Sequence, residues 1–211
     1  MDRNNYFDKI APQWDRMRSQ FFSPAVRDKA FRLAGVEPGR LAGDIGAGTG
    51  FLTEGLLSRD VRVIAVDQSQ KMLDQIQHRF GESDHIDCRV GTAERLPIDD
   101  EMLDYVFANM YLHHVEDPAH AIREMTRVLK PGGVLVVTDL DEHSHEFLRT
   151  EHNDRWMGFD RDDVRSWLQQ ASLRSVDVES IGEECGATSS EGEEAAISIF
   201  VALGRKNSLA A

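Results

Sequence analysis

Short apolar segments alternate with amphipathic helical segments through the middle of this 211-residue chain. This alternation constrains the fold, because successive strands separated by a helix pair in parallel through right-handed crossovers. The pattern predicts an α/β fold with a doubly wound, Rossmann-like sheet. The strands expected from it are residues 40–46, 61–67, 86–91, 104–110 and 134–140.

The helices between these strands carry start and stop signals. Ser69 is a suitable N-cap for "SQKMLDQIQHRF", in which Met72 and Leu73 begin an apolar face at helical spacing. The helix "HAIREMTRVLK" is expected to run to Lys130 and to end at the breakers Pro131–Gly133.

The C-terminal part of the chain departs from the alternation. Residues 160–172 form an amphipathic helix, and two strands at 174–181 and 197–204 follow without a helix between them. We expect the acidic segment 182–195 to be a loop that joins them into an antiparallel hairpin. The sheet is therefore predicted to have seven strands, mostly parallel, with helices on both faces.

Composition and charge exclude several kinds of partner. The formal net charge of −13 repels phosphate backbones and disfavours a nucleic-acid partner. No apolar run is long enough to span a bilayer, and the first ten residues lack the apolar centre of a signal peptide. We expect a cytoplasmic protein with no membrane partner, and its oligomeric state stays open.

The two cysteines, Cys88 and Cys185, allow neither a disulfide framework nor a zinc site with four thiolates. Cys88 alternates with Ile86 and Val90, which predicts an inward-facing strand position and a buried, unreactive thiol.

The segment "DIGAGTGFL", residues 44–52, lies between the first strand and the following helix, where open parallel sheets bind ligands. A turn without a ligand and a dinucleotide site are the alternatives. The dinucleotide fingerprint needs a third glycine at position 51, which is Phe51. Asp44 would also repel a pyrophosphate, so the loop is expected to meet a cationic group of its ligand.

With this loop the chain resembles the class I S-adenosylmethionine-dependent methyltransferases, whose first motif is D-x-G-x-G-x-G. The segments "AVDQS", "GTAERLP", "ANMYLHHVEDP" and "REMTRVLKPGG" extend the resemblance over residues 40–140 in the same order. The last two segments and "YFDKIAPQWD" are similar to the branch that includes ubiquinone/menaquinone C-methyltransferases and arsenite methyltransferases.

The resemblance implies S-adenosyl-L-methionine as cofactor and S-adenosyl-L-homocysteine as product. Asp67 would accept hydrogen bonds from the ribose hydroxyls, Gln68 and Met72 would flank the adenine, and Tyr6 would close over the cofactor. Thr92 replaces the usual acid, so a backbone carbonyl or Glu94 would meet the adenine amine. The full set of expected cofactor residues is Tyr6, Asp44, Gly46, Ala47, Gly48, Gly50, Asp67, Gln68, Met72, Thr92, Ala93, Glu94, Asn109 and Met110.

Methyl transfer is an in-line displacement, so alignment and exclusion of water matter most, and a base is needed only when the acceptor must lose a proton. Six of the eight histidines follow the fourth and fifth predicted strands. Local packing, acid–base work and a metal site are the alternatives for them, and no metal is our prediction. The acid–base candidates are His113, His114, His143 and His152.

The acceptor pocket is expected to include Trp14, His145, Trp156, Phe159 and Cys185. Residues 141–159 resemble a stretch of the arsenite-type enzymes, but those rely on several thiolates and only Cys185 could reach this pocket. Cys185 is otherwise a solvated loop thiol, because neighbouring glutamates raise the pKa of a thiol.

The overall prediction is a methyltransferase that acts on a small molecule, with one domain over residues 1–205 and a tail at 206–211. Residues 1–35 would form a helical lid, 36–140 the cofactor half, and 141–205 the substrate half. The alternatives are an arsenite methyltransferase, a non-catalytic module that binds S-adenosylmethionine, and an NAD(P)-dependent reductase.

Overall fold

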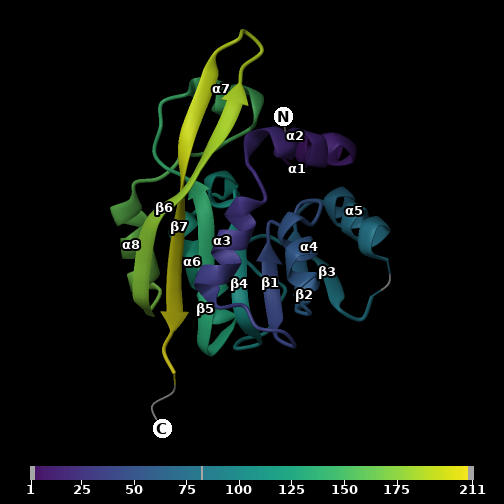
Figure 1. Cartoon of the computed structure of the whole chain (residues 1–211), viewed down its shortest axis with the longest axis vertical. Helices are drawn as coiled ribbons and strands as arrows, with labels where there is room; N and C mark the ends of the chain where they lie inside the picture. The colour runs from purple at the N-terminus through teal and green to yellow at the C-terminus, as the bar shows by residue number, and fades with distance from the viewer. Residues whose placement is uncertain (1–2, 82, 209–211) are drawn as a thin grey trace.

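The computed structural model describes residues 3–81 and 83–208, and Figure 1 shows a sheet flanked by helices. The strands are β1 (Leu41–Ile45), β2 (Arg62–Asp67), β3 (Ile86–Val90), β4 (Leu103–Asn109), β5 (Leu129–Leu140), β6 (Leu173–Thr188) and β7 (Glu194–Lys206). The helices are α1 (Arg3–Ile10), α2 (Trp14–Phe21), α3 (Ala25–Ala34), α4 (Phe51–Leu57), α5 (Gln70–Phe80), α6 (Pro118–Arg127), α7 (Glu146–Glu151) and α8 (Arg161–Gln170). Two 3-10 turns, η1 (Ala11–Gln13) and η2 (Leu112–His114), complete the elements.

The seven strands form one sheet in the order β3-β2-β1-β4-β5-β7-β6. Strands β1 to β5 pair in parallel, and β7 is antiparallel to both β5 and β6. The predicted doubly wound, mostly parallel sheet is confirmed. The winding reverses between β1 and β4, so a ligand is expected beyond the carboxyl ends of these strands.

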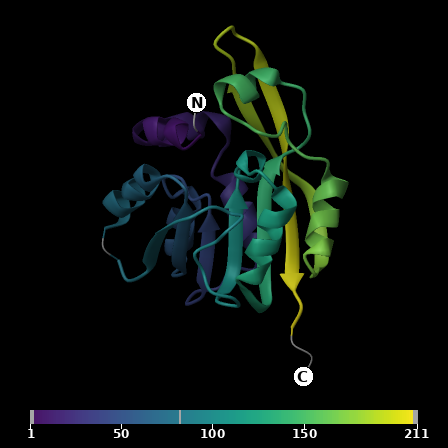
Figure 2. The ribbon, with the colours of Figure 1, turned by 180° about the vertical axis from the view of Figure 1, so that it is seen from behind.

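Helices cover both faces of the sheet, as predicted. Apolar residues of α3, α4 and α5 belong to one buried core, and those of α6 and α8 belong to the other. Figure 2 shows the molecule from behind, with α6 and α8 on the near face. The predicted lid over residues 1–35 includes α3, but this helix lies in the core, since Val26 and Phe31 are almost fully buried.

The α1–η1–α2 segment, purple in Figure 1, lies across the carboxyl ends of β1 and β2. Two hydrogen bonds attach it there. The Ser69 hydroxyl donates to Asp8 (2.6 Å), and the Thr49 hydroxyl donates to Asp15 (2.6 Å). We call this segment the lid.

Two predicted boundaries are wrong. Helix α6 ends at Arg127, and β5 begins at Leu129, because Val128 and Leu129 are fully buried and Leu129 pairs with Leu103. The Pro-Gly-Gly segment therefore lies within the start of a strand.

The acidic segment 182–195 is mostly strand. Strands β6 and β7 continue to a turn at residues 189–193, because buried residues alternate with more exposed ones along both strands and the glutamates occupy exposed or partly exposed positions. Cys185 is one of the buried residues, so the prediction of a solvated loop thiol is wrong. Cys88, on the edge strand β3, is only partly buried.

Candidate functional site

The glycine loop between β1 and α4 needs glycine at three positions. Gly46, Gly48 and Gly50 have φ angles of 71°, 52° and 93°, a region that other residues rarely adopt. A methyl group at Gly46 would overlap the Tyr111 ring, and one at Gly48 would lie 3.3 Å from Nε1 of Trp14. The loop therefore lets Tyr111, the N-cap residue of η2, and Trp14 of the lid come close to its backbone.

Asp44, at the end of β1, is a buried carboxylate with 2% of its surface exposed. The backbone N–H and the hydroxyl of Thr53 donate to the same oxygen, Oδ2, at 2.9 and 2.7 Å. Burial nevertheless raises the pKa of Asp44 to about 6. A cationic ligand beside this carboxylate would favour its ionised form.

Asp67, at the end of β2, links this strand to the glycine loop. Its Oδ2 accepts from the backbone N–H of Gly48 and its Oδ1 from that of Ser69, both at 2.9 Å. Burial raises the pKa of Asp67 despite these hydrogen bonds. The two carboxylates thus lie at neighbouring strand ends, as parallel pairing requires.

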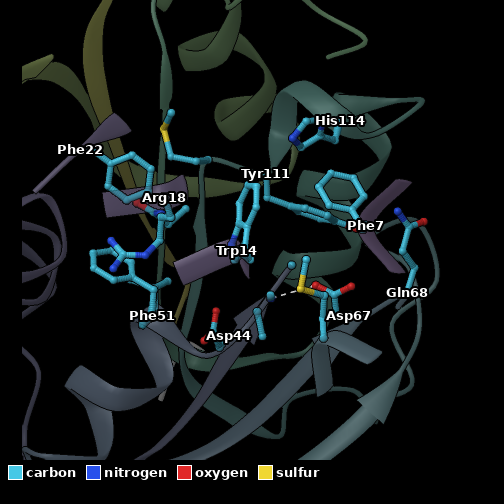
Figure 3. A pocket seen from close by; sticks show the side chains of 17 residues that line it. Phe7, Trp14, Arg18, Phe22, Asp44, Phe51, Asp67, Gln68, Tyr111 and His114 are labelled. Carbon is cyan, nitrogen blue, oxygen red and sulfur yellow. Dashed lines mark hydrogen bonds between the residues drawn. The ribbon is translucent and has the colours of Figure 1, made fainter. Parts of the chain in front are cut away.

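A first cavity, with roughly 610 Å³ of empty space, opens at these strand ends (Figure 3). The predicted cofactor residues that line it are Asp44, Gly46, Ala47, Gly48, Asp67, Gln68, Met72, Asn109 and Met110. Trp14, predicted for the acceptor, lines it too. His114, predicted as an acid–base candidate, also lines this cavity. The residues that sequence reasoning missed are Phe7, Arg18, Phe22, Phe51, Leu52 and Tyr111.

Arg18 is the most informative of the missed residues. Figure 3 shows its side chain between the rings of Phe22 and Phe51, and its guanidinium carbon lies 4.2 Å from the Phe51 ring centroid. Its Nε and Nη1 atoms are buried and have no hydrogen-bond partner among the described residues. No spacing in "WDRMRSQF" distinguishes Arg18 from Arg16, so the sequence offered no signal for it.

Five predicted cofactor residues do not line the first cavity. Tyr6 lines a second cavity. Gly50 is the N-cap residue of α4, and Ala93 is fully buried behind the surface. Thr92 and Glu94 line an adjoining depression that Gln68, Tyr111 and His114 also border.

The second cavity, with roughly 480 Å³ of empty space, adjoins the first. Trp14, Phe22, Met110 and His114 line both cavities, so a group in one lies next to a group in the other. The remaining residues of the second cavity are Tyr6, Phe21, His113, Leu140, Leu148, His152, Asp154 and Cys185.

His113 lies between two carboxylates in this cavity wall. Its Nδ1 is 2.6 Å from Oδ1 of Asp139, and its Nε2 is 3.7 Å from Oδ1 of Asp154. Burial disfavours a charge on the ring, but Asp139 and Asp154 outweigh it and raise the pKa of His113 to about 9. An imidazolium cannot accept a proton, so His113 is a poor base at neutral pH.

The other candidate histidines differ in position. His152 lines the second cavity, and its buried Nε2 lacks a hydrogen-bond partner within the described part of the chain. His143 lines neither cavity, and burial, with the nearby His145 and His113, lowers the pKa of His143 to about 4. His145 pairs with Glu193 of the hairpin at 2.9 Å and also lies outside both cavities.

The prediction that Trp156 and Phe159 line the acceptor pocket is wrong. Trp156 is 40% exposed and donates from Nε1 to the carbonyl of Val115. Phe159 packs against Trp167 in the core. Cys185 does line the second cavity, and burial raises the pKa of its thiol to about 12.

Comparison with known proteins shows similarity to methyltransferases. Residues 43–137 match a protein-family model described as a methyltransferase domain. An uncharacterized methyltransferase of Mycobacterium tuberculosis is 45% identical over 92 residues, which are 44% of this chain and 36% of that protein. The demethylmenaquinone methyltransferase of Bacillus cereus is 30% identical over 147 residues, 66% of this chain and 62% of that protein.

Solved structures share the fold at lower identity. The (4+2)-cyclase SpnF has a TM-score of 0.77 at 16% identity, with 97% of this chain and 95% of that chain covered. In the described part of the chain, no helix has the length and apolar character to cross a membrane.

Proposed function

We propose that this chain transfers the methyl group of S-adenosylmethionine to a small-molecule acceptor, because residues 43–137 match the model of a methyltransferase domain. The observation that carries this proposal is the first cavity, where Asp44 and Asp67 lie at neighbouring strand ends and the second cavity adjoins. The cofactor supplies an electrophilic methyl group on a sulfonium. Demethylmenaquinone methylation by the Bacillus cereus relative supports a small acceptor.

The residues of the first cavity fit the amino-acid end of this cofactor. Asp44 offers a carboxylate to the ammonium group, and the buried, unpartnered nitrogens of Arg18 offer donors to the carboxylate. Gly46 and Gly48 let Tyr111 and Trp14, which also line this cavity, lie against the backbone of the glycine loop. Asp67 would accept from the ribose hydroxyls, and Gln68 and Met72 would border the adenine.

The lid would exclude water from the reacting groups. Its aromatic rings Phe7 and Trp14 line the first cavity, and Trp14 also borders the second. An acceptor in the second cavity would thus face the cofactor across Met110 and His114. Where the acceptor must lose a proton, we propose His152 as the base, since its Nε2 faces no partner among the described residues.

Calorimetry with S-adenosylhomocysteine and with methylthioadenosine, which lacks the amino-acid end, tests the cofactor site. Arg18→Ala should weaken the binding of S-adenosylhomocysteine by about 1.5–3 kcal/mol, the usual range for a charge-assisted hydrogen bond. The binding of methylthioadenosine should be unchanged. Arg16→Ala is the matched control on the same helix, and it should change neither. Equal losses for both ligands would mean that Arg18 does not meet the carboxylate.

Incubation with deuteromethyl-labelled cofactor and a metabolite extract tests the transfer itself. A labelled small molecule is the expected product, and His152→Gln should then lower kcat more than it changes KM. Absence of any labelled product, with S-adenosylhomocysteine bound, would support a function without methyl transfer. A cofactor-binding protein that does not transfer the methyl group is therefore the second candidate function. The (4+2)-cyclase SpnF, which is named for a different reaction, has the same fold, and a fold alone does not fix the function.

Arsenite methylation and NAD(P)-dependent reduction have less support. An arsenite site needs several thiolates, and Cys185 is the one thiol that lines the second cavity in the described residues. NADH binding would revive a reductase, but Asp44 and Phe51 both line the cavity where a pyrophosphate would lie. The single domain and the cytoplasmic location remain predictions.

A further inference from the structure

Three side chains, His113, His114 and Asp154, converge where the second cavity meets the first. One nitrogen of each histidine and one oxygen of Asp154 lie within 4.8 Å of one another. The side chains are 6%, 11% and 5% exposed, respectively. His113 and His114 come from η2 after β4, whereas Asp154 comes from the segment after α7.

The distances suit a shared ion better than direct hydrogen bonds. Nε2 of His113 and Nδ1 of His114 lie 3.7 and 3.8 Å from the same oxygen, Oδ1 of Asp154. Hydrogen bonds between nitrogen and oxygen are about 2.7–3.2 Å long. Ligands of a tetrahedral ion with bonds of about 2.0–2.1 Å are roughly 3.3 Å apart, so these two nitrogen–oxygen distances exceed that spacing by about 0.4–0.5 Å. The histidine nitrogens, which lie within 4.8 Å of each other, would close to the same spacing around the ion.

A second carboxylate fixes the orientation of His113. Asp139 is fully buried, its Oδ1 lies 2.6 Å from Nδ1 of His113, and it also accepts from the backbone N–H of Leu140 at 2.8 Å. This contact turns Nε2 toward Asp154. Metal-bound histidines commonly have such a carboxylate behind the ring, where it sets the tautomer and increases ligand basicity.

We propose that His113, His114 and Asp154 bind one divalent transition-metal ion, with Asp139 as the supporting carboxylate. Two imidazoles and one carboxylate suit Zn²⁺, Co²⁺, Ni²⁺ or Fe²⁺ better than Mg²⁺ or Ca²⁺, which prefer oxygen ligands. The ion would displace the proton from Nε2 of His113 to solvent and would balance the charge of two buried carboxylates, Asp139 and Asp154. This proposal departs from the prediction of no metal made from the sequence.

The remaining coordination positions would face the second cavity. An oxygen or nitrogen of the acceptor could take one of them, and the ion would lower the pKa of a coordinated hydroxyl. His152 lines the same cavity and could take the proton. This role rests on the proposed function, whereas binding of the ion does not.

Titration of Zn²⁺ and Co²⁺ into the full chain, freed of affinity tags and treated with chelator, tests the site without cofactor or acceptor. We expect one ion per chain by calorimetry and a four- or five-coordinate ligand-field spectrum for Co²⁺. Asp154→Asn and His114→Ala should each weaken binding at least tenfold. Asp139→Asn should weaken it about 10–100-fold while the stoichiometry is unchanged, as expected for a supporting residue.

His120→Ala and His145→Ala are matched controls, because these histidines contact Glu94 and Glu193 outside the cluster. They should bind the ion as the parent protein does. Binding of S-adenosylhomocysteine and the melting temperature show that each variant is folded, and His114→Ala keeps the test decisive if Asp154→Asn does not fold.

Two results would overturn the proposal. One is no stoichiometric ion in the parent protein, which would leave His113 in contact with Asp139 and Asp154 without an ion. The other is binding that survives in both Asp154→Asn and His114→Ala. Either result with intact binding of S-adenosylhomocysteine removes the metal site alone, and lost cofactor binding with an intact ion site removes the proposed function alone.

Discussion

Replacing Asp44 with asparagine should stabilise the ligand-free protein above pH 6 and weaken cofactor binding. Burial raises the pKa of Asp44 to about 6, whereas the unfolded chain titrates near 4. Below pH 4 the carboxyl is neutral in both states. Between pH 4 and 6 the unfolded chain releases its proton and the folded chain keeps it, so the free energy of unfolding falls as pH rises.

The magnitude follows from the two pKa values. Each pH unit between them is worth about 1.4 kcal/mol, so the ionised carboxylate destabilises the fold by roughly 3 kcal/mol above pH 6. About 2 kcal/mol of this develops between pH 4.5 and 7.5. Asparagine does not titrate, and its oxygen can still accept from both donors of Thr53. Comparing two pH values cancels any constant effect of the substitution.

Urea denaturation of both proteins at pH 4.5 and 7.5 measures this difference. The advantage of Asp44→Asn in the free energy of unfolding should grow by about 2 kcal/mol toward the higher pH. S-adenosylhomocysteine at 100 times its Kd should stabilise the parent by about 2.7 kcal/mol, and the same concentration should stabilise the variant less. A difference independent of pH, or equal stabilisation by the ligand, would refute the reasoning.

Three further substitutions or reactions test the site. Gly46→Ala should lower the free energy of unfolding by about 1–3 kcal/mol more than Gly39→Ala. Both glycines have positive φ, but only a methyl group at position 46 would meet the Tyr111 ring. Equal melting temperatures for the two variants would contradict this. Asp67→Ala should weaken the binding of S-adenosylhomocysteine, measured by calorimetry, by about 2–4 kcal/mol, because two charge-assisted hydrogen bonds are lost. An unchanged Kd would show that Asp67 does not bind the ribose. Cys185 should react with iodoacetamide at pH 8 far more slowly in the native protein than in urea, because burial raises the pKa of this thiol to about 12; similar rates by mass spectrometry would contradict its placement.

Much of the fold followed from local patterns. Strand and helix periodicity, together with the cap at Ser69, predicted the parallel strands and their order along the chain. The glutamates of 182–188 misled the prediction because charged residues can occupy the outward side of a long hairpin. Lys130 and Pro131–Gly133 misled it because burial of Val128 and Leu129 outweighed the breaker signal.

The residues of the candidate site were also only partly predictable from the sequence. Asp44 and Asp67 end neighbouring parallel strands, so their positions in the sequence already place them together at one edge of the sheet. Arg18, by contrast, enters the cavity because the lid crosses that edge. The meeting of Asp154 with His113 also depends on how the segment after α7 folds back.

The amino-acid sequence was enough to predict the sheet, the glycine loop and the two carboxylates. Strand, helix and turn formation depend on residues close together in the chain, and right-handed crossovers then restrict how the strands can pair. The packing of separate elements was needed to show that Arg18 lines the first cavity and that two histidines share the wall of the second with Asp154, about 40 residues further along the chain. Those contacts join separate elements, and their geometry depends on how the elements pack, which no local spacing encodes.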